Sequence, residues 1–218
     1  MTLPAAIAKT SKQKGGAPGR PKDLSKGAAI LEAAKQLFTQ HGFDGVSMDQ
    51  IAAAAGVSKL TVYSHFGDKD ALFLAAVRAK CEEVMPPELY LAALKGPLRE
   101  QLTEIARAFF GLITSEEALS MHRMMLTESS DPHARQMFWE AGPKQVKAAF
   151  AQFLDSRIEA GELVVPDVTR AASQFFCLLK GELHMRMASG LCGKPEPAEV
   201  DAHIDATVDL FLRAYGRQ

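Results

Sequence analysis

The chain has 218 residues, of which 47% are hydrophobic and 23% are charged. This composition supplies enough apolar side chains for a folded core and excludes an intrinsically disordered chain. No apolar run approaches the length of a membrane-spanning helix, and Pro4 and scattered lysines interrupt the first residues where a signal peptide needs an apolar stretch, so we expect a cytoplasmic protein with no membrane segment.

Charge is distributed unevenly along the chain. Through Lys69 there are nine Lys and Arg residues against five Asp and Glu residues, whereas the remainder carries sixteen against twenty-one. A basic first part followed by an acidic remainder indicates that only the first part meets a polyanion.

Metal and redox chemistry have little support in the sequence. Cys81, Cys177 and Cys192 form no CxxC pair and have no histidine at zinc-ligand spacing, so we predict buried free thiols. A redox-sensing role for Cys192, in the loop-like GLCGKPEP, is the alternative. The sequence contains no HExxH motif, no phosphate-binding glycine loop and no nucleophile elbow. We therefore expect no metal, no cofactor and no enzymatic activity.

One group of acidic residues and a histidine near the carboxyl end needs separate consideration. Asp201 and Asp205 would share a helix face while His203 points elsewhere, and no ExxH pair completes a carboxylate site. Solvated charges, rather than metal ligands, are predicted for these three residues.

Residues 1–24 are rich in Lys, Gly, Pro and Ala without periodicity, which predicts a flexible basic arm. Arg20 lies in a Gly-Arg-Pro sequence similar to segments that insert an arginine into the minor groove of DNA. The alternative is a solubilising tail.

Residues 25–69 predict three helices. The first runs from Ser25 or Lys26 to His41 and carries an apolar residue at every third or fourth position. Ser47 and Gln50 form a capping-box pattern that starts the second helix, which Gly56 ends. Ser58 can cap a third helix that ends at Phe66. Two short helices joined by a glycine turn indicate a helix-turn-helix.

The outward face of the third helix carries short polar, hydroxyl and cationic groups that a core does not need. Such groups at a helix N-terminus suit a major groove, because phosphates accept hydrogen bonds from hydroxyls, ammonium groups and helix-end N–H groups. An ordinary solvated helix end is the alternative. The candidate DNA-binding residues around this helix are Ser47, Ser58, Lys59, Leu60, Thr61, Tyr63, Ser64, His65 and Lys69.

Residues 70–218 form the second predicted domain, which is larger and entirely helical. A helix from about Asp68 to Val84 leaves the first domain and enters the second, and Pro86 and Pro87 are predicted to break the chain after it. Helical patterns then recur to Tyr215, and no two-residue alternation indicates a strand after residue 85. The prediction is an all-α protein with about nine helices, consisting of a three-helix head and a helical bundle.

The stretch GVSKLTVYSHFGDKDALF resembles the recognition helix and following turn of TetR/AcrR-type regulators. Nine positions match that pattern: Gly56, Val57, Ser58, Thr61, Val62, Tyr63, His65, Phe66 and Lys69. Leu60 stands where many members have Gly, and Ser64 where many have Tyr, which leaves the operator sequence open. Segments such as FFCLLKGELHMR resemble the C-terminal domain of the AefR-like branch.

The helical body is expected to hold a cavity for a small hydrophobic ligand, because pockets form between bundle helices and are mostly apolar. Methionine adapts to irregular ligands, and aromatic rings offer flat faces. Ordinary core packing is the alternative for each residue taken alone. The candidates are Phe109, Phe110, Met121, His122, Met124, Met125, Trp139 and Phe176.

The last two helices are expected to form a homodimer, which is the usual arrangement in the family that the chain resembles. Their apolar stripes are formed by Phe175, Phe176, Leu178, Leu179 and Leu183 in one helix and by Val200, Ile204, Val208, Phe211 and Leu212 in the other. Burial of these stripes within one subunit is the alternative. A two-fold dimer would place its recognition helices on a near-palindromic operator.

Together, the residues and the resemblance imply a DNA-binding transcriptional repressor that a small hydrophobic ligand releases from its operator. Two alternatives stay open: a small-molecule enzyme or carrier built on a helical bundle, and a transcriptional activator. The ligand, the operator and the regulated genes do not follow from the sequence.

Overall fold

The computed structural model describes residues 23–92, 96–125 and 131–217. Apart from an isolated bridge between Leu163 and Gly216, these ranges contain no β-structure, and their eleven helices confirm the predicted all-α class. About nine helices were expected. One that the sequence did not indicate is α5 (Pro87–Ala92), where a chain break was predicted. Pro87 begins this helix instead, because the first helical position needs no N–H donor.

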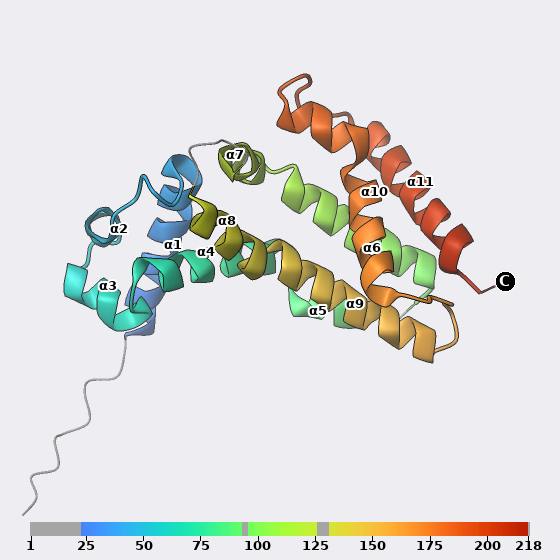
Figure 1. Cartoon of the computed structure of the whole chain (residues 1–218), viewed down its shortest axis with the longest axis horizontal. Coiled ribbons are helices and arrows are strands. Elements are labelled where there is room, and N and C mark those ends of the chain that lie inside the picture. Colours follow the sequence, from blue (N-terminus) through green and yellow to red (C-terminus); the bar gives the residue numbers. More distant parts are fainter. Residues whose placement is uncertain (1–22, 93–95, 126–130, 218) are drawn as a thin grey trace, which may run out of the picture.

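Three helices, α1 (Leu24–His41), α2 (Met48–Ala54) and α3 (Lys59–Phe66), form a head at one end of an elongated molecule (Figure 1). The side chain of Asp23 accepts a hydrogen bond from the Ser25 N–H at 3.1 Å, so α1 starts slightly earlier than predicted. The Ser47 and Gln50 capping box is present in both directions, as predicted. The predicted minor-groove residue Arg20 lies outside the described residues.

Helix α4 (Lys69–Val84) connects the head to the body, and the head core continues into it. Leu72, Phe73, Ala76 and Val77 of α4 pack in the same cluster as Ile30, Phe38 and Ile51 of the head. A body helix, α8 (Pro132–Ala141), completes this cluster with Ala134, Met137 and Ala141. The division predicted between residues 69 and 70 therefore passes through a continuous core.

The body also contains five further helices. They are α6 (Leu98–Ile113), α7 (Glu116–Met125), α9 (Pro143–Glu159), α10 (Val168–Ala188) and α11 (Pro197–Tyr215). Four of these, all but α7, surround a second core. Phenylalanine rings dominate this core, with the ring centroids of Phe150 and Phe175 4.7 Å apart and those of Phe175 and Phe211 5.0 Å apart. None of the helices in the described ranges combines the length and apolarity that crossing a membrane requires.

The apolar stripes of α10 and α11 pack mainly inside the subunit. Phe175, Leu179, Ile204 and Val208 are fully buried, as are their neighbours Phe176, Leu183 and Phe211 to within a few per cent. The second core uses these seven side chains, so they cannot meet a partner subunit, whereas Leu178 of the predicted stripe is exposed and the homodimer itself stays a prediction. The opposite sides of the two helices leave Leu178, Met185 and Leu210 37%, 59% and 51% exposed.

Cys177 lies on this exposed side of α10, so the prediction that all three thiols are buried is wrong. Cys81 and Cys192 are half-buried, and all three cysteines are free. Burial raises the pKa of the Cys81 thiol to about 11, which keeps it protonated at neutral pH.

Helix α10 contains a kink at Gly181, whose φ of 46° and ψ of −159° are not helical. Close to the kink, Nε2 of His203 in α11 donates a hydrogen bond to the carbonyl oxygen of Leu179 at 2.7 Å. His203 therefore binds a backbone group and is not the solvated side chain that the sequence predicted. Asp201 pairs with Arg107 of α6. Of the three residues considered for a metal site, only Asp205 is fully exposed.

Replacing Gly181 with alanine should destabilise the protein by about 1–3 kcal/mol, because this backbone conformation is almost restricted to glycine. An added Cβ would also lie 3.0 Å from Cε1 of His203. Gly111, inside α6, has no atom within 4 Å of an added Cβ, so Gly111→Ala should be neutral or stabilising. Urea unfolding of both variants tests this difference, and equal stabilities would contradict it.

Candidate nucleic-acid interface and ligand cavity

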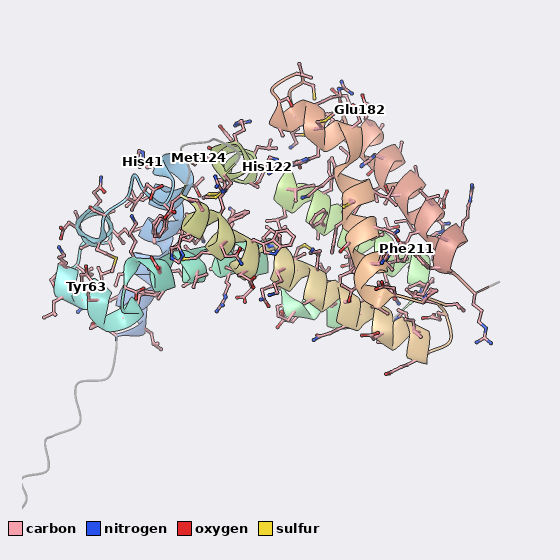
Figure 2. The ribbon with its side chains drawn as sticks, in the orientation of Figure 1. His41, Tyr63, His122, Met124, Glu182 and Phe211 are labelled. Atoms are coloured by element: carbon pink, nitrogen blue, oxygen red, sulfur yellow. The ribbon has the colours of Figure 1, made fainter. Side chains whose placement is uncertain are left out.

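Helix α3 lies at the end of the head and exposes one apolar and aromatic face (Figure 2). Val62 is fully buried, as predicted, whereas Leu60 is 79% and Tyr63 is 43% exposed. Gly56, with a φ of 65°, forms the turn that allows α3 to follow α2 directly. Leu60 and Tyr63 are therefore exposed to solvent on the outer face of α3.

The hydroxyl groups of the predicted interface already have partners within the head. Oγ of Ser58 accepts a hydrogen bond from the Thr61 N–H at 3.2 Å and lies 2.8 Å from the Thr61 hydroxyl. Ser64 donates to the carbonyl oxygen of Thr61 at 2.8 Å, and Ser47 donates to Gln50 at 2.9 Å. These hydroxyls cap and brace the helices, so the first role of each is local structure.

The basic residues of the predicted interface differ in their surroundings. Nζ of Lys59 lies 2.9 Å from Oδ2 of Asp49, and this hydrogen bond raises the pKa of the lysine. Nζ of Lys69 lies 4.2 Å from the centre of the Phe43 ring, a cation–π contact. The ring of His65 is half-buried against α1, where a Cβ added at Gly27 would lie 3.2 Å from its Nδ1. Among these three residues, Lys59 has an exposed side chain and lies at the start of α3.

A cavity of about 710 Å³ lies between the head and the body, with walls from α1, α4, α6, α7, α8 and α10. This volume suits a small organic molecule. Its apolar lining comes from both parts of the protein and includes Phe38, Phe73, Val77, Leu112, Ile113, Met121 and Phe138. A ligand there would touch the first helix of the head directly.

Only two of the predicted ligand residues, Met121 and His122, line this cavity. Phe109 and Phe176 pack against each other in the body core, with ring centroids 4.2 Å apart, and Phe110 is buried in the same core. Trp139 is 45% exposed and lies beneath Nζ of Lys147 at 4.3 Å. Aromatic content alone does not distinguish core, surface and cavity positions.

The two remaining methionines of α7 face the head instead of the cavity. A Cβ added at Gly42, which follows α1, would lie 3.1 Å from Sδ of Met124 (Figure 2). Met125 packs against the head core. Helix α7 therefore carries cavity residues and head contacts within one turn of each other.

The cavity also contains residues that the sequence did not single out as ligand contacts, namely His184 and Lys180 of α10. The ring centroids of His122 and His184 lie 5.4 Å apart in an edge-to-face arrangement. Burial lowers the pKa of His184 to about 4, and the nearby charges of His122 and Lys180 act in the same direction. Burial and nearby cations also lower the pKa of His122, so both rings are largely neutral at pH 7.

The chain matches two known protein families in adjacent segments. Residues 30–76 match the family described as bacterial regulatory proteins, tetR family. Residues 100–217 match the AefR-like transcriptional repressor, C-terminal domain. The second match alone covers more than half of the chain.

Individual proteins agree with these matches. The chain is 35% identical over 74 residues to the repressor AcnR of Corynebacterium glutamicum, a match that spans 33% of this chain and 39% of AcnR. It is 32% identical over 165 residues to the regulatory protein RaaS of Mycobacterium tuberculosis, covering 74% of this chain and 71% of RaaS. The solved structure of the flavonoid-responsive regulator FrrA is 32% identical and superposes with a TM-score of 0.69, covering 90% of this chain and all of that one.

Lowering the pH should destabilise the protein partly through His184. Its pKa in the folded state is near 4, below the ordinary 6.5, so the unfolded chain takes up the proton first as the pH falls. The stabilisation from His184 is therefore complete above pH 6.5 and is lost towards pH 4. His184→Leu should flatten this part of the pH dependence in urea unfolding, and an unchanged slope would contradict the assignment.

Proposed function

Because the chain belongs to the TetR family of bacterial regulators, we propose that it binds a specific DNA operator and represses transcription until a small hydrophobic ligand releases it. The observation that carries this proposal is the exposed face of α3 at the end of the head, which follows a basic stretch of sequence and is joined to the body beside a cavity. Such a protein acts on chromosomal DNA, which places it in the cytoplasm.

In this proposal, α3 enters the major groove with Lys59, Leu60 and Tyr63 towards the base edges. The exposed side chain of Leu60 offers an apolar contact for a thymine methyl group, and Lys59 offers a donor for guanine. Ser58, Thr61, Ser64 and the first N–H groups of α3 approach phosphates. The neighbouring Ser47, His65 and Lys69 support that position, and Arg20 reaches the adjacent minor groove.

A homodimer through the exposed sides of α10 and α11 would present two such heads to a near-palindromic operator. The exposed Leu178, Met185 and Leu210 provide the apolar contacts, since the other sides of these helices are occupied in the second core. Cys177 lies on the same side of α10.

The ligand would act by changing the angle of α4 and therefore the spacing of the two heads. A molecule in the cavity contacts α1 and α4 on one side and α7 on the other, and α7 continues to the head through Met124 and Met125. A ligand changes DNA affinity only if it binds one arrangement of the heads better than another. The structural relative FrrA is named as flavonoid-responsive, which supports a ligand response in this chain as well.

Gel-shift titration of the purified protein against DNA upstream of its own gene tests DNA binding. Lys59→Ala should relax preference among bases by about 1–3 kcal/mol at the contacted position. Lys69→Ala should weaken binding to all sequences alike and reduce the slope of log K against log salt by about one phosphate contact. Lys144→Ala, a surface change in the body, should alter neither.

A uniform loss of affinity in Lys59→Ala would assign Lys59 to the phosphate backbone instead of the bases. Absence of any protein–DNA complex at low salt, with the wild-type protein folded, would refute the proposed function itself.

Sedimentation velocity tests the dimer. Met185→Glu and Leu210→Glu should each convert the dimer to monomer, because a carboxylate in an apolar interface loses its hydration without gaining a partner. Leu60→Glu also places a charge on an exposed leucine, but on α3, and should leave the dimer intact while abolishing DNA binding. A dimer that resists both body substitutions would place the interface elsewhere.

A further inference from the structure

One end of the cavity is formed by three nitrogen-bearing side chains from two helices. His122 comes from α7, and Lys180 and His184 come from α10, where they flank the kink at Gly181. His184 is only 6% exposed, yet neither imidazole forms a hydrogen bond to any other residue that the structure describes. Within the described residues, the ring nitrogens of both histidines are therefore available to hydrogen-bond a molecule in the cavity.

The lining of the cavity carries charges of both signs, with Glu116 and Glu117 in the first turn of α7 and Lys180 in α10. Within the described ranges Lys180 forms no ion pair, and the charges that act on the two imidazoles are those of Lys180 and Arg123. The opposite rim differs, because Lys35 pairs with both Glu32 and Glu83, and Lys80 lies 3.9 Å from Glu83. A negative group beside Lys180 would therefore meet an ammonium group that no carboxylate in the described ranges already pairs with.

The surface between the two ends is apolar. The half-buried Ile113 and Phe138 contribute to it, together with the more deeply buried Val77, Leu112 and Met121. Apolar walls stabilise a ligand in proportion to the apolar area that they remove from water. The cavity therefore combines the nitrogen-bearing side chains of His122, Lys180 and His184 with an apolar surface that can cover the rest of a ligand.

We infer that the cavity binds an amphipathic monoanion, an aromatic or acyl molecule with one acidic group, which His122, Lys180 and His184 hold at the α7 and α10 end. This inference rests on the proposed function only in taking the cavity as the regulatory site. Each neutral imidazole donates its N–H to the acidic group, and the Lys180 ammonium supplies the opposite charge. The apolar body of the ligand lies against the head.

Two fluorescent probes that share one ring system test this assignment. The first, 8-anilinonaphthalene-1-sulfonate, carries a single anionic group, and the second, N-phenyl-1-naphthylamine, lacks it. Both are titrated into the purified protein without DNA. Lys180→Gln should weaken binding of the sulfonate by about tenfold, as expected for loss of a hydrogen bond to a charged group, and should leave the amine within about twofold.

His184→Leu should lower the ratio of the two affinities in the same direction, since leucine fills the site but donates no hydrogen bond. Lys194→Gln removes the same charge from the exposed loop between α10 and α11 and should change neither probe. Lys180 is exposed, so its variant folds even if His184→Leu does not. An unchanged ratio in Lys180→Gln, equal losses for both probes, or no binding of either would overturn the inference.

These outcomes are separate from those of the DNA experiment. If the probe ratio falls as expected but the protein forms no DNA complex, the anion site stands and the proposed function fails. If the protein binds DNA but the ratio does not change, only the ligand class is refuted.

Discussion

The whole arrangement depends on α4 being buried in two cores. Its first turns pack Leu72 and Phe73 into the head, while Cys81 and Met85 at its other end pack against the body. An α-helix is stiff over this length, so displacement of one end moves the other. Helix α7 lies on another wall of the cavity and contacts the same head, so both α4 and α7 link the head to the body around the cavity.

The local features of the head could be predicted because each depends on neighbouring residues. Ser47 with Gln50, Ser58 with Thr61 and the turn at Gly56 are specified within three or four positions of sequence. The alternation of buried Val62 with exposed Tyr63 follows from helix periodicity in the same way. Tertiary partners such as Phe43 under Lys69 did not enter that prediction.

The body could be predicted as helical but not in its internal use of side chains. Ile204 and Met185 both belong to apolar helices, yet one is buried in the subunit and the other is exposed, because the packing of α6 and α9 decides which side is covered. The cavity is harder still, since Phe38, Met121 and His184 come from three distant segments. Trp139 was predicted to line the cavity but lies at the surface, where Lys147 covers its ring.

The contribution of α8 to the head core bears on how far the parts of such proteins are interchangeable. Ala134, Met137 and Ala141 close a cluster whose other members lie more than fifty residues earlier in the chain. A chimera that joined this head to the body of a relative would expose Phe73 and Ile51 to whatever side chains that relative has in place of these three. A chimera with an exchanged head should fold only when the matching residues of α8 are transferred together with that head.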